Sequence, residues 1–155
     1  MSSANSGGVE VGASWPLVVV AVGGVGLVVM FMAAGSSDWG PPGTETYESY
    51  QMMNRLVAVP AVLLVLGVLA TGFQGRGSLG VLGWVSWLLG LTGSLLVLAG
   101  NVAEFWLFTS RAYGDPARNL AWSSFLLGVA LLLVAGILGA EHASRTRPER
   151  ELTRT

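Results

Sequence analysis

The chain of 155 residues contains no cysteine, no lysine and one histidine, His142. The absence of cysteine excludes disulfide bonds, thiolate catalysis, haem attachment through CxxCH, and zinc or iron–sulfur sites built on cysteine. The single histidine follows the last apolar run and leaves no His-rich metal set and no Ser-His-Asp arrangement. We therefore expect no metal centre, no cofactor and no set of catalytic residues.

Charge is also scarce. Charged residues make up 11% of the chain, whereas soluble domains carry about 25%. Hydrophobic residues make up 52% and the mean hydropathy is +0.63. This composition is typical of a membrane protein, so the lipid bilayer is its first partner. The net charge of -1 argues against nucleic acid as a partner.

The uncharged residues are gathered in four runs of 18 to 22 residues. A helix needs about 20 apolar residues to cross a bilayer, and helices satisfy every backbone amide in lipid. The sequence therefore predicts an all-α membrane protein, a four-transmembrane-helix bundle with up-down-up-down topology. The helices are expected at about 15–35, 54–73, 79–108 and 119–141.

The first run has an alternative interpretation as a secretory signal peptide, because Ala33, Ala34 and Gly35 resemble a small-residue cleavage site. Residues 1–14 contain no Lys or Arg, however, and a signal peptide begins with a positive segment. The sequence thus favours a retained helix, in a transmembrane domain over 15–140 with a disordered segment at 1–14. The polar, Arg-rich residues 142–155 are expected to form a tail, with Pro148 ending any helix there.

The distribution of arginine predicts the orientation. Four helices place both termini on one side, together with Arg76 and the four arginines of the tail, whereas the other side holds Arg55, Arg111 and Arg118. The positive-inside rule therefore predicts cytoplasmic termini and a multi-pass protein of the cell (plasma) membrane. The segment from Thr44 to Asn54 is expected either to lie at the membrane interface or to extend the second helix outward.

Small residues form a stripe along the third run. Steps of three and four residues connect Gly83, Ser86, Gly90, Gly93, Val97, Gly100 and Glu104. Small side chains at this spacing let two helix backbones approach closely in lipid. We therefore expect this stripe to be the face on which the third helix packs against other helices.

The stripe ends at a carboxyl group, Glu104, with Asn101 three residues earlier on nearly the same side. Glu104 lies 25 residues beyond Leu79, about 37 Å along a helix, so it is expected near the outer headgroup boundary at the height of Arg55. In one interpretation Glu104 is a structural carboxylate paired with Arg55, Arg111 or Arg118. In the other, Glu104 binds a proton or cation with Asn101 as a neutral co-ligand.

These features lead to two functional hypotheses. The first is a small integral membrane protein without catalytic activity, acting as a structural or accessory subunit or as a self-associating bundle. Its partner would be another membrane protein or a second copy of the chain. The alternative is a small transporter or channel with an outward-facing carboxylate site at Glu104 and Asn101. Small multidrug transporters differ because their key carboxylate lies in the first helix, which here has none.

Overall fold

The computed structural model describes residues 15–36, 40, 43–75, 79–112 and 114–152, without the side chains of 146–152. The segment 1–14 and Arg76 lie outside the described residues, and so do the expectations that concern them. The described elements are all helical, in the order α1 (Trp15–Gly35), α2 (Glu45–Leu56), α3 (Ala58–Gly75), α4 (Val81–Val102), the π-helical turn η2 (Ala103–Leu107) and α5 (Pro116–Leu152).

Four helical stretches are long and apolar enough to cross a membrane, which confirms the predicted all-α membrane bundle. They are Trp15–Gly35, Glu45–Gly75, Val81–Leu107 and Pro116–Arg145. Large apolar side chains cover their outer surfaces, including Val81 and Ile137, which are 84% and 69% exposed. Such a surface is unfavourable in water, and it is the expected surface for helices that face lipid.

Two of the predicted boundaries are wrong. The second stretch begins at Glu45 instead of residue 54, because Thr44 caps α2 by accepting a hydrogen bond from the Tyr47 amide. Of the two alternatives for this segment, the structure shows the extension of the second helix. The last helix continues past residue 141 and through Pro148 to Leu152. Ala, Glu and Arg favour helix in this stretch, and Glu141 pairs with Arg145 one turn later.

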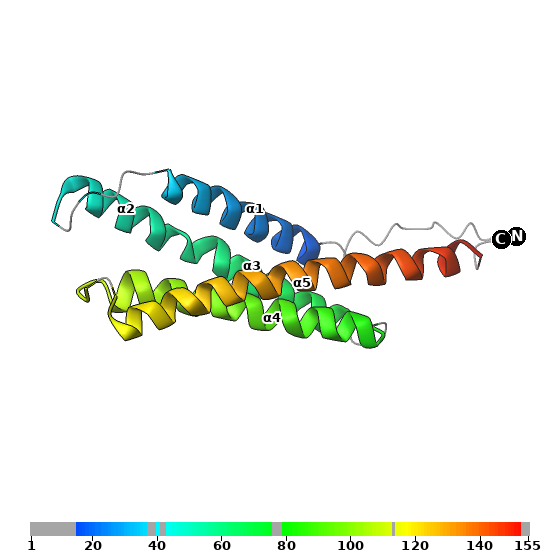
Figure 1. The fold of residues 1–155 in the computed structure, drawn as a ribbon. Coiled ribbons are helices and arrows are strands. Elements are labelled where there is room, and N and C mark those ends of the chain that lie inside the picture. The colour runs from blue at the N-terminus through cyan, green and yellow to red at the C-terminus, as the bar shows by residue number, and fades with distance from the viewer. Residues whose placement is uncertain (1–14, 37–39, 41–42, 76–78, 113, 153–155) are drawn as a thin grey trace, which may run out of the picture.

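The helices form two long pairs that lie side by side (Figure 1). The first pair is α1 against the α2–α3 stretch, and the second is α4 against α5, with α3 and α4 in contact between the pairs. Both pairs approach through glycine. A Cβ atom on Gly23 would lie 2.7 Å from the Leu64 backbone nitrogen, and one on Gly128 would lie 2.6 Å from the Gly93 carbonyl oxygen. Close backbone approach therefore replaces side-chain interdigitation at these crossings.

The core is small, since most apolar side chains face outward. It is centred on Leu27, Val57, Ala61, Leu64, Val97 and Phe125, which come from α1, the α2–α3 junction, α4 and α5. The helix is interrupted at Val57 because the ring of Pro60 clashes with the carbonyl four residues earlier, that of Leu56. The Val57 amide donates to the Asn54 carbonyl oxygen, three residues earlier, at 3.2 Å.

Candidate functional site

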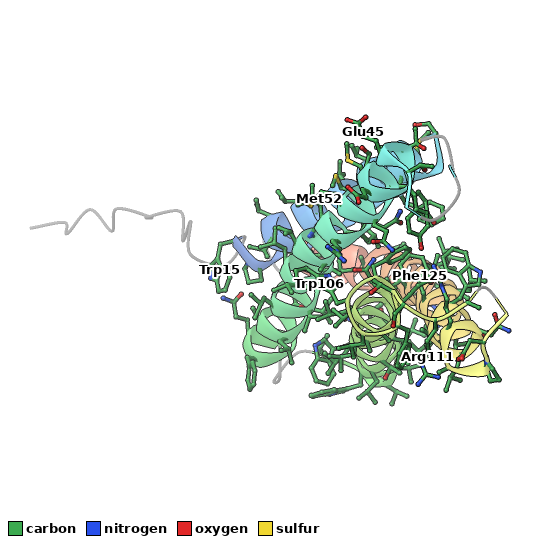
Figure 2. All side chains as sticks on the ribbon, turned by 90° about the vertical axis from the view of Figure 1, so that its left-hand side faces the viewer. Trp15, Glu45, Met52, Trp106, Arg111 and Phe125 are labelled. Atoms are coloured by element: carbon green, nitrogen blue, oxygen red, sulfur yellow. The ribbon has the colours of Figure 1, made fainter. Side chains whose placement is uncertain are left out.

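Of the five buried polar side chains among the described residues, all but Ser94 lie at one end of the bundle, where α2, η2 and the start of α5 meet. We call this region the polar end and define it by Asn54, Asn101, Glu104 and Arg118, together with the half-buried Arg55. Figure 2 looks onto this end, with Glu45 at the outer tip of α2 and Arg111 beside the start of α5.

The π-helical turn η2 determines how Glu104 is presented. The Phe108 amide donates to the Ala103 carbonyl oxygen at 2.9 Å, which closes a turn of five residues at the end of α4. The wider turn rotates the following side chains relative to the regular stripe on α4. Glu104 and the neighbouring Phe105 are both buried in the protein.

Glu104 pairs with Arg118 from the first turn of α5. The Arg118 Nε lies 3.5 Å from Glu104 Oε1, and their side chains are 5% and 9% exposed. Arg118 also donates through Nη1 to the Arg111 carbonyl oxygen at 3.1 Å. Of the three arginines considered from the sequence, the structure brings Arg118 to the carboxylate. A buried pair of this kind ties η2 to α5, and removing either partner leaves an uncompensated charge.

The start of α5 is itself fixed by Asp115. The Ala117 amide donates to Asp115 Oδ1 at 2.9 Å, and Arg111 donates to both carboxylate oxygens. The backbone hydrogen bond from Ala117, followed by the nearby Arg111, lowers the pKa of the Asp115 carboxyl below its ordinary value. Asp115 therefore fixes the loop that contains Arg111. The carbonyl oxygen of Arg111 accepts the hydrogen bond from Arg118.

Asn101 joins α4 to α2. Its Nδ2 donates to the Asn54 carbonyl oxygen at 2.9 Å, and the Asn54 side chain donates to the Tyr50 carbonyl oxygen at the same distance. Asn101 and Asn54 are both buried. The Asn54 carbonyl oxygen also accepts from the Val57 amide at 3.2 Å, so it has one donor from its own stretch and one from α4.

Arg55 contacts the π-helical turn η2, but it does not pair with the Glu104 carboxylate. Its Nε donates to the Phe105 carbonyl oxygen at 2.9 Å, and its guanidinium lies 5.7 Å from the centroid of the Trp106 ring. The structure therefore separates the predicted group of Glu104, Asn101 and Arg55 into three connections with different partners. All three connections end on α4 or η2.

Two oxygen atoms at the polar end are buried and lack a hydrogen-bond partner among the described residues: Asn101 Oδ1 and Glu104 Oε2. Both atoms accept hydrogen bonds, so either can bind a water molecule, a protonated group or a cation. Arg118 already balances the charge of the Glu104 carboxylate, which disfavours a divalent cation at this position.

The small residues of the α4 stripe lie against α5. A Cβ atom on Gly100 would come within 2.6 Å of the Ala121 carbonyl oxygen, and one on Gly93 within 2.8 Å of that of Gly128. Ser86 donates to the Ala135 carbonyl oxygen at 2.8 Å. Gly83 is less constrained, facing the His142 and Leu79 side chains, and a Cβ atom on Gly90 would make ordinary contacts near 3.7 Å.

Sequence reasoning did not identify Asn54 as part of the site, and it left Arg118 as one of three candidates. Asn54 is the one polar residue that shares a helix face with Tyr47 and Tyr50, and that pattern could have identified it. No comparable pattern distinguishes Arg118 from Arg111. Among the described residues, no group of three or more His, Cys, Asp or Glu side chains is placed to hold a metal ion.

Comparison with known proteins gives one short similarity. A stretch of 54 residues is 43% identical to a lipoprotein signal peptidase from Azoarcus sp. (strain BH72). The match covers 35% of this chain and 31% of that protein, so the chain spans about a third of its relative. No protein-family model matches the chain, and no solved structure matches it significantly.

Proposed function

We propose that this multi-pass membrane protein has no catalytic activity and serves as a structural or accessory subunit, bound to another membrane protein or to copies of itself. The observation that carries the proposal is the use of the buried polar groups. Glu104 binds Arg118, Asn101 binds the Asn54 carbonyl and Arg55 binds the Phe105 carbonyl. Each of these connections joins one helix to another, which is a structural role.

The exposed surface supports association as well. Gly35, at the end of α1 and outside the groove described below, has open space where a side chain would be. Such a position lets a second helix approach closely in lipid. Purification of the tagged protein in a mild detergent, with cross-linking before extraction, tests the proposal. We expect a complex of fixed stoichiometry or a homo-oligomer, and a monomer under all conditions would contradict it.

A second function, transport of a proton or cation, is favoured by one specific observation, the two buried acceptor oxygens of Asn101 and Glu104. Glu104→Gln separates the two functions, because it removes the charge and keeps the shape. Loss of an ion-dependent flux in reconstituted vesicles, with normal accumulation of the protein, would favour transport. Reduced accumulation, or no change in flux, would favour the structural role.

The short similarity to a lipoprotein signal peptidase suggests a third activity to be tested, cleavage of a lipoprotein precursor. Glu104 is the buried acidic residue among those described, and it is already paired with Arg118. We expect no cleavage of a lipoprotein precursor in vesicles that contain the purified protein. Cleavage that is lost in Glu104→Gln would contradict the non-catalytic proposal.

We also propose that both termini are cytoplasmic and that the protein resides in the plasma membrane. Because the chain contains no cysteine, single cysteines introduced as Ser2→Cys and Thr155→Cys give an unambiguous test. Neither cysteine should react with an impermeant maleimide added to intact cells, and both should react after the cells are opened. Labelling of either one in intact cells would contradict the orientation.

A further inference from the structure

A groove of about 660 Å³ opens between α1 and α5, away from the polar end. Its floor comes from α3 and α4, including Leu64, Val68 and Gly90. The groove exists because α1 packs on α3 while α5 packs on α4. α1 and α5 meet where the rings of Phe31 and Phe125 stack, 5.8 Å between centroids, beyond the residues that line the groove. Its volume falls within the range of about 300–1,000 Å³ that is usual for ligand sites.

The lining of the groove is apolar, and its few side-chain donors are already used within the protein. Ser86 donates to the Ala135 carbonyl oxygen, Thr71 donates to the Val68 carbonyl oxygen, and so does the indole of Trp87. Most of the length of the groove therefore offers no free donor for the recognition of a polar ligand. Its occupant must be apolar along its length.

The length of the groove suits an acyl chain. On α5 the lining extends from Val129 to His142, which is 13 residues or about 20 Å of helix. One leaflet supplies half of the ~30 Å hydrocarbon core, or about 15 Å. The groove is therefore long enough to hold an extended hydrocarbon chain of one leaflet along its length.

The surroundings of the groove supply such a chain. All four walls belong to helices that are long and apolar enough to span a membrane. The groove ends at His142, where α5 passes from its apolar stretch into Glu141, His142 and Arg145. We propose that the groove binds one acyl chain of a membrane phospholipid, which lies lengthwise between α1 and α5 with its headgroup at the His142 end.

Two glycines in the wall make this proposal testable without disturbing the packing. Gly24 on α1 and Gly136 on α5 both line the groove, and a Cβ atom on either would meet no atom within 4 Å. Gly24→Leu and Gly136→Leu should therefore fill the groove and leave the helices in place. Gly35→Leu is the matched control, because Gly35 also has open space and does not line the groove.

The experiment uses the full chain in vesicles of phosphatidylethanolamine and phosphatidylglycerol. A small fraction of the phosphatidylethanolamine carries a diazirine near the end of one acyl chain, and the labelled residues are mapped by mass spectrometry after illumination. We expect the label to concentrate on groove residues such as Leu27, Val129 and Leu132. Each filled variant should reduce that labelling about fivefold, which corresponds to ~1 kcal/mol, and Gly35→Leu should leave it unchanged.

Three results would overturn the proposal. The first is labelling spread evenly over apolar residues outside the groove, such as Leu66 and Leu95, which would indicate ordinary bilayer contact. The second is groove labelling that both filled variants leave unchanged. The third is a cross-link through the groove between two copies of the chain. If one filled variant fails to fold, the other variant and the labelling map of the unaltered chain still decide the question.

Discussion

The polar end and the groove are built from the same four helical stretches, but different kinds of contact join the helices in the two regions. At the polar end, side chains reach from one helix to another, as Asn101 does to the Asn54 carbonyl and Arg118 to Glu104. Around the groove, Ser86 and Trp87 join α4 to α5 and to α3, whereas α1 and α5 meet through the stacked rings of Phe31 and Phe125. One end is closed by charged and amide side chains, and at the other a groove stays open because α1 packs on α3 and α5 packs on α4.

This difference shows what apolar packing alone can specify in lipid. Between helices in a bilayer, burial of apolar surface gives no net driving force, because the lipid chains are equally apolar. Glycine contacts set the distance between two helices, but a directed polar contact also sets their rotation. The following predictions alter one region at a time, beginning with the largest expected effect.

Loss of the arginine at the polar end should have the largest effect. In Arg118→Leu the Glu104 carboxylate would remain buried without its cation, and we expect the free energy of unfolding to fall by about 3 kcal/mol. Titration with sodium dodecyl sulfate in mixed micelles measures this quantity. Arg111→Leu is the control, because the Arg111 side chain is 50% exposed and pairs with Asp115 near the surface. Its effect should stay below about 1 kcal/mol, and equal effects of the two variants would contradict the structural role of Arg118.

The glycine contacts should come second, and they should differ along one helix. In Gly100→Ala the added methyl group would meet the Ala121 carbonyl oxygen and the Phe125 backbone nitrogen at 2.6 and 2.7 Å. Because both atoms belong to the backbone, we expect a loss of about 2 kcal/mol in the free energy of unfolding. Gly90→Ala, which has room near the groove, should instead gain about 0.5 kcal/mol from helix propensity. The same titration compares the two variants. A similar loss in both would mean that the cost of an added methyl group does not depend on its distance from the atoms of the neighbouring helices.

The replacement of Arg55 should have a smaller effect. Arg55→Lys keeps the charge but loses the Nε hydrogen bond to the Phe105 carbonyl oxygen and the planar contact with Trp106. We expect a loss of about 1 kcal/mol in the free energy of unfolding. Arg145→Lys, on the exposed part of α5, is the matched control and should be neutral. A neutral Arg55→Lys would mean that the positive charge alone matters at this position.

The smallest effect should appear in the pH dependence. The hydrogen bond from the Ala117 amide lowers the pKa of Asp115 from the ordinary value of 3.8. A carboxyl group with a lowered pKa stabilises the folded state above its unfolded pKa, and that stabilisation is lost as the pH falls through the folded pKa. The stability difference between the unaltered protein and Asp115→Asn should therefore shrink as the pH is lowered from about 6 to about 3. A difference that stays constant over this range would exclude the ionised form of Asp115 as its source.

The sequence was sufficient to predict the four membrane-spanning helices, because the absence of charge over 18 or more residues reports directly on the lipid environment. It also placed small residues on the α4 face that meets α5. The sequence did not identify the partner of Glu104, since Arg55, Arg111 and Arg118 are all expected near the outer boundary of the membrane. The choice among them depends on the π-helical turn η2 and on the hydrogen bonds of Asp115 at the start of α5, and the periodicity of the sequence indicates neither.

The observed helix boundaries differ from the predicted ones because local interactions, and not only the apolar pattern, determine where a helix begins and ends. The apolar run begins near residue 56, yet the helix begins at Glu45 because the Thr44 cap and the buried Tyr47 and Tyr50 stabilise a polar segment. Pro60 lies near the start of that run, and the structure shows an interruption at Val57.

The most direct test of the structural role of the polar end is a double-mutant cycle between Glu104 and Arg118. The free energy of unfolding is measured for Glu104→Gln, for Arg118→Gln and for the double variant. A structural pair predicts that the double variant is more stable than the sum of the two single losses implies, with a coupling energy of about 2 kcal/mol. Losses that add to within about 0.5 kcal/mol would mean that the carboxylate and the guanidinium are energetically independent, and would contradict the account.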